Sequence, residues 1–121
     1  MRLRLTVRVS KDLRFAEVGS PGYFKSHEVP RTPSDLNDHP CIGIRVGGGP
    51  YRWEFEKGPK KQTVSVQGPA VFDDANFVIQ AVLNRVGIGL AFEEQVAELL
   101  KKRRLIRVLE DWCSPFPGYF L

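Results

Sequence analysis

The sequence predicts an α/β domain, and three observations carry that prediction. Residues 73–86 have the apolar spacing of a helix, and Gly87 and a short apolar run, residues 88–92, follow directly. Residues 3–9 alternate between apolar and polar side chains, which is typical of a half-buried strand. Residues 51–66 contain two strand-like runs around a Gly-Pro turn, which is typical of a β-hairpin. Together these elements indicate a mixed sheet of about five strands, flanked by helices and accompanied by a hairpin.

The length and the cysteine content bound the class of protein. The chain has 121 residues, enough for a single domain over residues 1–121. It has no apolar run long enough to span a bilayer, and its N-terminus lacks the apolar segment of a signal peptide. We therefore expect a cytoplasmic protein in which Cys41 and Cys113 are separate reduced thiols, rather than a disulfide or a metal pair. Neither cysteine stands at metal-ligand spacing from His27 or His39, so no metal site is expected.

The first third of the chain alternates strands with short helices. After the first strand, residues 13–18 are expected to form a second one. Ser20 can cap a short helix through residues 23–24, because its side-chain oxygen can accept a backbone N–H. The N–H groups of that helix would face whatever lies beyond the strand end, so Ser20 is either a binding residue or part of a plain connection. Proline punctuation then predicts one further short capped helix within residues 30–38.

The middle of the chain contains a strand, a glycine loop and the hairpin. Residues 41–45 read as a strand, and residues 46–50 read as a flexible loop. The three glycines of this loop resemble a phosphate-binding loop, but the Lys-Ser/Thr pair and the following helix are missing, which argues against nucleotide binding. In the hairpin Tyr51, Trp53 and Phe55 share one face, an arrangement more typical of a core than of a ligand cage.

The helix of residues 73–86 is the segment around which the rest is arranged. An Asp at its start is in N-cap position, and Gly87 is expected to end it in a left-handed conformation. Apolar residues lie on more than one side of it, so we expect it to be covered around most of its circumference. These residues are Phe77, Val78, Ile79, Ala81, Val82, Leu83 and Val86. Val82 and Leu83 in particular are expected to be buried.

The last third contains an amphipathic helix, a strand at residues 105–109 and an apolar run at residues 119–121. The helix begins with Glu93-Glu94 and ends in the basic run of residues 101–104, with Arg107 beyond it. Acidic residues first and basic residues last is the order that the helix dipole favours. The basic run is therefore either a solvated helix end, which is the simpler interpretation, or a phosphate-binding patch. The formal net charge of +4 is mild and does not by itself indicate a nucleic-acid partner.

No residues form a recognisable catalytic group. No Ser, His and Asp occur with a nucleophile elbow. Asp73 and Asp74 are adjacent at a helix start, so their side chains diverge and capping explains them better than acid–base catalysis. We therefore expect that this protein is not an enzyme and that it uses no cofactor.

Several motifs, taken together, resemble the effector-binding region of LysR-type transcriptional regulators. These motifs lie at residues 13–24, 30–36, 39–42, 51–57, 87–91 and 105–121. The resemblance covers nearly the whole chain, but only the second of the family's two α/β lobes, which are arranged as in type 2 periplasmic binding proteins. It implies a single Rossmann-like lobe, without the helix-turn-helix or the first lobe. Phe92-Glu93 replaces a Leu-Pro that is frequent in the family, and Lys102-Arg103 replaces a common Ser-Gly turn.

The resemblance implies that the lobe binds a small organic effector, such as a carboxylate, on the face formed by strand ends and helix starts. General α/β geometry agrees with that placement. The implied binding residues are Ile44, Arg45, Gly47, Gly48, Asp73, Asp74 and Phe92, with Ser20 as a further candidate. Arg45 is the expected partner of a carboxylate through a bidentate contact. Asp73 and Asp74 would oppose an anion at the same face.

The sequence favours two functions, and direct nucleic-acid binding through residues 101–107 stays open as a third. The first is a truncated or free-standing effector-binding lobe of a LysR-type regulator. The second is a protein-interaction module that uses the old cleft face to assemble with itself or with a full-length regulator. In the family, residues 3–9 and the segment ending at Leu121 run on into the first lobe, so we expect both to leave unpaired edges that a homodimer covers. Neither DNA binding, without a helix-turn-helix, nor membrane binding is expected.

Overall fold

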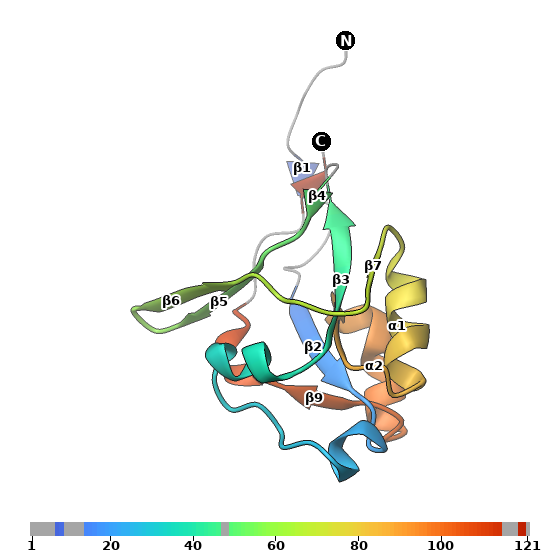
Figure 1. Ribbon diagram of the computed structural model, residues 1–121. Coiled ribbons are helices and arrows are strands. Elements are labelled where there is room, and N and C mark those ends of the chain that lie inside the picture. The colour runs from blue at the N-terminus through green and yellow to red at the C-terminus, as the bar shows by residue number, and fades with distance from the viewer. Residues whose placement is uncertain (1–6, 9–13, 47–48, 115–118, 121) are drawn as a thin grey trace.

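The computed structural model describes residues 7–8, 14–46, 49–114 and 119–120 (Figure 1). Its strands are β1 (Val7–Arg8), β2 (Phe15–Gly19), β3 (Cys41–Val46), β4 (Gly49–Pro50), β5 (Trp53–Lys57), β6 (Lys60–Val64), β7 (Ala70–Phe72), β8 (Ile88–Phe92), β9 (Ile106–Val108) and β10 (Tyr119–Phe120). Its α-helices are α1 (Ala75–Leu83) and α2 (Glu93–Lys101), and its 3₁₀ helices are η1 (Tyr23–Lys25), η2 (Pro33–Asp38) and η3 (Glu110–Trp112).

The main sheet is mixed, as predicted. Its strands lie in the order β4-β3-β8-β2-β9, and β7 pairs with β3. Strand β3 runs parallel to β7 and β8, whereas β2 runs antiparallel to both of its neighbours, β8 and β9. The β5–β6 hairpin forms a separate two-stranded sheet. The α/β class and the mixed sheet with an additional hairpin are therefore confirmed.

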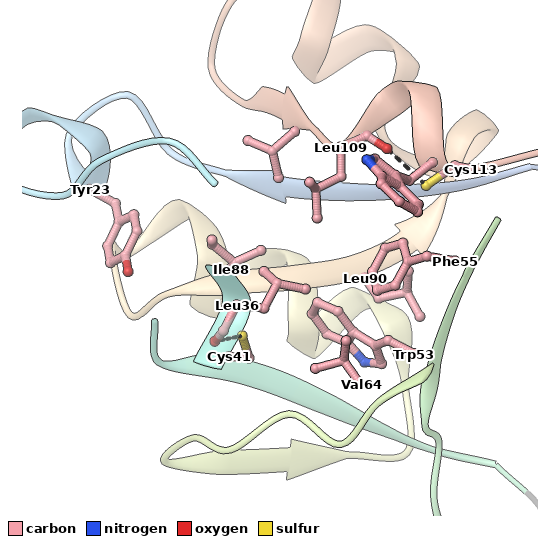
Figure 2. Close-up of a cluster of buried hydrophobic side chains, with 12 residues drawn as sticks. Tyr23, Leu36, Cys41, Trp53, Phe55, Val64, Ile88, Leu90, Leu109 and Cys113 are labelled. Carbon is pink, nitrogen blue, oxygen red and sulfur yellow. Dashed lines mark hydrogen bonds between the residues drawn. The ribbon is translucent and has the colours of Figure 1, made fainter. Parts of the chain in front are cut away.

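The sheet has a buried layer on each face. Helices α1 and α2 cover one face, and the hairpin and the 3₁₀ helices cover the other (Figure 1). On the helix face the buried side chains are small and aliphatic: Ala16, Val18, Ile42, Val78, Ile79, Val82, Ala91, Val96 and Leu105. On the hairpin face they include the large aromatic residues (Figure 2). Alternate residues along each strand supply the two layers, because successive strand side chains point to opposite faces.

The start of α1 agrees with the sequence prediction, and its end does not. Asp74 is the N-cap, and its carboxylate accepts the backbone N–H of Asn76 at 2.8 Å. The helix ends at Leu83, and Arg85 rather than Gly87 takes the left-handed conformation, with φ 65°. Gly87 is needed for a different reason: a Cβ there would lie 2.0 Å from the carbonyl oxygen of Pro40.

The expectation that α1 is covered around most of its circumference is wrong. Val82 is fully buried, as predicted, but Leu83 is only half-buried. Phe77 is 59% exposed and contacts Phe72, with 5.8 Å between the ring centroids. The apolar spacing could not separate these positions, since it reports hydrophobicity and not the angle at which the helix meets the sheet.

The hairpin buries one aromatic face against the sheet, as its alternation predicted. Trp53 and Phe55 are buried, whereas Glu54 and Glu56 between and beyond them are exposed. Figure 2 shows Trp53 and Phe55 among side chains from β6, β8 and the segment after β9. The two-residue turn contains Gly58 with φ 59°, a conformation that suits glycine. The hairpin therefore covers the aromatic core on its own face of the main sheet.

Two smaller expectations needed adjustment, and a third is confirmed. The loop of residues 46–50 contains a short strand, β4, that folds back onto the end of β3. The N-cap of η1 is Gly22, although the Ser20 hydroxyl does accept the Tyr23 N–H at 3.1 Å. The predicted helix within residues 30–38 is present as η2 and is capped by Thr32.

The first and last described strands pair with each other. Val7 lies opposite Phe120 and Arg8 lies opposite Tyr119, in an antiparallel two-stranded ribbon, β1–β10, apart from the main sheet (Figure 1). The expectation that both segments leave unpaired edges is therefore only partly right, because each of these strands covers one edge of the other. The rest of both predicted strands lies outside the described residues.

Candidate functional site

The candidate site is one end of the main sheet, which we call the strand-end face and define by Phe15, Arg45, Asp73 and Phe92. Strands β3, β7 and β8 are parallel, so their carboxyl ends meet at the same end of the sheet. Strand β2 is antiparallel to β8 and therefore begins there, with Phe15 opposite Phe92. Residues that are far apart in the sequence, from four strands, therefore lie along one end of the main sheet.

Arg45 and Asp73 form the charged part of the strand-end face. The Arg45 guanidinium donates to the Asp73 carboxylate, with 3.2 Å between Nη1 and Oδ1. The two side chains are 44% and 76% exposed, so the pair is weak by itself and open to exchange with another ligand. Asp74 is occupied with capping α1, which explains why it does not compete for Arg45.

Aromatic rings form the apolar part. Phe15 and Phe92 stack, with 5.0 Å between their centroids and 13° between their planes, and Tyr51 lies 5.6 Å from Phe15. Burial raises the pKa of the Tyr51 hydroxyl, so this group stays a neutral donor. A hollow of about 590 Å³ extends from the Phe15 and Tyr51 rings toward the hairpin and η3, and its lining includes neither Phe92 nor Arg45 and Asp73. It is lined by Phe15, Tyr51, Glu54, Phe55, Glu56, Lys61, Gln62, Thr63, Trp112, Cys113 and Ser114.

The structure brings together most of the expected binding residues, but not Ser20. Ile44 is half-buried next to Arg45 and packs against both cores, so only part of it can reach a ligand. Gly47 and Gly48 lie outside the described residues. Ser20 is 5% exposed and follows the far end of β2, where β8 begins. It therefore cannot share a ligand with Arg45, and the antiparallel direction of β2 is the reason.

Sequence reasoning missed an ionic group beside the strand-end face. Arg107 donates to the Glu93 carboxylate and, at 2.8 Å, to the carbonyl of Phe15. Arg14 lies 3.6 Å from Glu93 and 3.7 Å from Glu110. The sequence suggested Arg107 as an extension of the basic run of residues 101–104, but β9 carries it to the other end of the lobe. The one local signal was Glu93, which stands where the family often has a proline.

The two thiols are unsuited to nucleophilic chemistry. Cys41 and Cys113 are both free and buried. Burial, with a smaller contribution from Glu17, raises the pKa of Cys41 to about 12, and the pKa of Cys113 is raised for the same reasons. A thiol must be deprotonated to attack a substrate or bind a metal, so both are inert at neutral pH. Within the described ranges, no three His, Cys, Asp or Glu side chains are placed to hold a metal ion, and no helix is long and apolar enough to cross a membrane.

The architecture defines a class: an α/β lobe with a mixed sheet, in which several parallel strands end together at one edge. Comparison with known proteins gives the family. The LysR substrate binding domain matches residues 3–121, and the chain belongs to this family. A putative transcriptional regulator of Pseudomonas aeruginosa is 40% identical over 119 residues, which are 97% of this chain and 39% of that protein. The Escherichia coli transcriptional regulator PgrR is 31% identical, over 97% of this chain and 40% of its own length.

Solved structures agree on the fold. The regulatory domain of AphB from Vibrio vulnificus superimposes with a TM-score of 0.83 at 22% identity, over 98% of this chain and 60% of that one. A shorter relative, the Escherichia coli protein YagP, is named as a putative LysR family substrate binding domain-containing protein. It is 29% identical over 70% of this chain and 64% of its own length. The chain thus spans about two fifths of the larger regulators that it matches, and those relatives are named as transcriptional regulators, not as enzymes.

Proposed function

We propose that this lobe binds a small organic anion at the strand-end face and serves as the sensing part of a transcriptional regulator. The observation that carries the proposal is the exposed Arg45 guanidinium, paired with Asp73 at the same end of the sheet as the stacked rings of Phe15 and Phe92. A carboxylate can displace Asp73 from Arg45 through a bidentate contact, while its apolar part lies against the rings. Family membership supports the same role, and so does general α/β geometry, because ligands of such folds bind at the carboxyl ends of the strands.

The affinity of this lobe alone is expected to be low. A cleft between two lobes contacts its ligand from both sides, and half of those contacts give roughly millimolar binding, about −4 kcal/mol. Ligand at ten times that dissociation constant stabilises the lobe by about 1.4 kcal/mol. For a domain of this size, the gain corresponds to a rise in Tm of several degrees.

A screen of aromatic and aliphatic carboxylates at tens of millimolar, read by thermal shift, tests Arg45. Arg45→Ala is expected to remove the shift, because a charge-assisted hydrogen bond contributes about 1.5–3 kcal/mol, or roughly 10- to 100-fold in affinity. Asp73→Asn is expected to increase the shift, since it releases Arg45 from its partner. Arg104→Ala is the matched control, because it removes an exposed arginine that follows α2, far from Asp73. If Arg45→Ala responds as the parent does, Arg45 is not the anchor.

We also propose that the lobe assembles as a homodimer. This is the alternative function, in which the strand-end face and its surroundings serve as a protein interface. Two observations favour it. The β1–β10 ribbon stands apart from the main sheet, and a two-stranded ribbon is marginally stable by itself. Next to Asp73, the exposed Phe77 ring and the half-buried Phe72 ring form an apolar surface on the α1 side of the edge strand β7, and Val71 is exposed on the other face of that strand. Exposed apolar surface at a strand edge favours pairing with another chain.

Light scattering across a dilution series tests the assembly state. We expect a dimer at tens of micromolar, since a stable interface buries more than about 1,000 Å². Phe77→Lys places a charge in the apolar surface and is expected to shift the equilibrium toward monomer, whereas Gln80→Lys, at an exposed position of the same helix, is not. A parent protein that stays monomeric and soluble at these concentrations would contradict the proposal.

A further inference from the structure

A buried carboxyl group lies in the middle of the main sheet. Glu17 is 1% exposed, on β2 between β8 and β9, opposite Leu90 and Val108. Its strand neighbours Ala16 and Val18 point into the core under the helices. Glu17 therefore points to the other face, into the aromatic core under the hairpin. A carboxyl group in such a place needs an explanation, because Glu is rarely buried without a partner.

The partner is a thiol. Cys113 donates its S–H to Glu17, with 2.8 Å between Sγ and Oε1. A thiol is a weak donor, so its hydrogen bond favours the carboxylate only slightly and does not replace the water that a carboxylate loses on burial. Burial raises the pKa of Glu17 to about 7, against smaller opposing effects of Cys113, its own backbone N–H and Arg107.

The other titratable and charged groups around Glu17 do not neutralise it. From β3 and from the segment before the hairpin come the neutral groups Cys41 and Tyr51, both with a raised pKa. Arg107 pairs with Val18 and so lies on the opposite face of the sheet, where Glu93 and the Phe15 carbonyl occupy it. Of the cations on the hairpin side, Lys57 is bound to Asp111, at 2.7 Å.

Cys113 also lies where the C-terminal part of the chain, which we call the outgoing chain, contacts the segment that leads into β2, which we call the incoming chain. Arg14, just before β2, donates from Nε to the carbonyl of Cys113 and from Nη2 to that of Glu110, the latter at 2.8 Å. Farther along, the same two chains pair as β1 and β10. The side chain and the main chain of Cys113 are thus held by two residues of one segment, Glu17 and Arg14.

We propose that Glu17 and Cys113 form a proton-controlled latch between the incoming and outgoing chains. The latch is closed while the Glu17 carboxyl carries its proton. When the carboxyl ionises, the buried carboxylate requires water, and the Cys113 segment moves aside to admit it. The pairing of the two chains at the base of the lobe then depends on pH, independently of any effector at the strand-end face.

The direction of the effect follows from linkage. In the closed latch the carboxyl has a pKa of about 7, above its ordinary value of 4.5 when exposed. As the pH rises, the open form therefore loses its proton first. The free-energy difference that favours the closed form falls between the two pKa values and stays constant above the higher one. Between pH 5 and pH 8 the opening equilibrium is expected to rise by tens of fold.

Hydrogen exchange on the whole chain tests the latch, with rates corrected for the intrinsic pH dependence. The reporters are the amides of Trp112 and Cys113, which donate to Leu109 and Glu110 in the closed form. In the parent we expect the opening equilibrium to be tens of fold larger at pH 8 than at pH 5. In Glu17→Gln we expect the amides to be as well protected as in the closed form at both pH values. Glu98→Gln, an exposed position, should behave as the parent. A parent without the pH effect, or a Glu17→Gln variant that retains it, would overturn the proposal.

A second measurement separates a latch from global unfolding and works without any variant. Amides in the middle of α1, such as that of Val82, should open less often than those of Trp112 and Cys113 at pH 8. If both sets change by the same factor through the same opening, the effect is global and the latch is wrong. A carbon NMR titration of the Glu17 carboxyl should give a midpoint near 7, and a midpoint near 4.5 would also overturn the proposal.

Discussion

Val82→Asp is expected to unfold the lobe. Val82 is fully buried at the centre of the helix-side core, and it lies so close to β8 that a Cβ on Gly89 would be 2.6 Å from its Cγ2. The carboxylate would have neither water nor a cation within reach of that position. An unpaired charge there costs several kcal/mol, against a total stability of about 5–15 kcal/mol.

Circular dichroism with urea unfolding measures this effect. Gln80→Asp is the matched control, because it places the same carboxylate at an exposed position of the same helix and should change stability by less than about 0.5 kcal/mol. Leu83→Asp should fall between the two, since Leu83 is half-buried. A soluble Val82→Asp protein that unfolds cooperatively at the midpoint of the parent would show that α1 does not pack as described.

Trp53→Ala is expected to destabilise the lobe by about 3–5 kcal/mol, the cost of removing a large buried aromatic side chain and leaving a cavity. Trp53 is fully buried and attaches the hairpin to the sheet (Figure 2). Its indole N–H has no hydrogen-bond partner among the described residues. Trp53→Phe should therefore cost clearly less, because it keeps much of the volume and removes the unpaired donor.

Denaturant unfolding of Trp53→Ala, Trp53→Phe and Glu54→Ala separates packing from hairpin propensity. Glu54 is the exposed neighbour on the same strand, so its replacement should be nearly neutral. If Glu54→Ala costs as much as Trp53→Ala, the hairpin is stabilised by its strand pairing and not by the buried indole.

The parts of the fold that were predictable are those with a local chemical signal. The Asp at the start of α1, the aromatic alternation of the hairpin and the run from Gly87 to Phe92 each specify an element within a few residues, and each was found in place. The end of α1 was missed because Arg85 adopts a left-handed conformation that glycine usually supplies. The exposure of Phe77 was missed because it depends on the packing angle of the helix.

The positions of the candidate site residues were predictable only where the direction of the strand that carries them was predictable. Arg45, Asp73 and Phe92 all follow or end parallel strands, so α/β geometry alone brings them together. Ser20 was misplaced relative to them because β2 is antiparallel, a property that its own residues do not encode. The contacts of Arg14 with Glu93 and Glu110 and the contact of Glu17 with Cys113 join residues far apart in sequence, so no local pattern indicates them.

The adjacency of β1 and β10 makes this lobe a portable insertion. Paired strands lie roughly 5 Å apart, so a host protein needs to open a single tight loop to accept the lobe at its two attachment points. Grafts of this geometry leave the host topology intact, since the chain leaves and returns at almost the same place. The ribbon of residues 7–8 and 119–120 is therefore a suitable junction for grafting this domain into another protein.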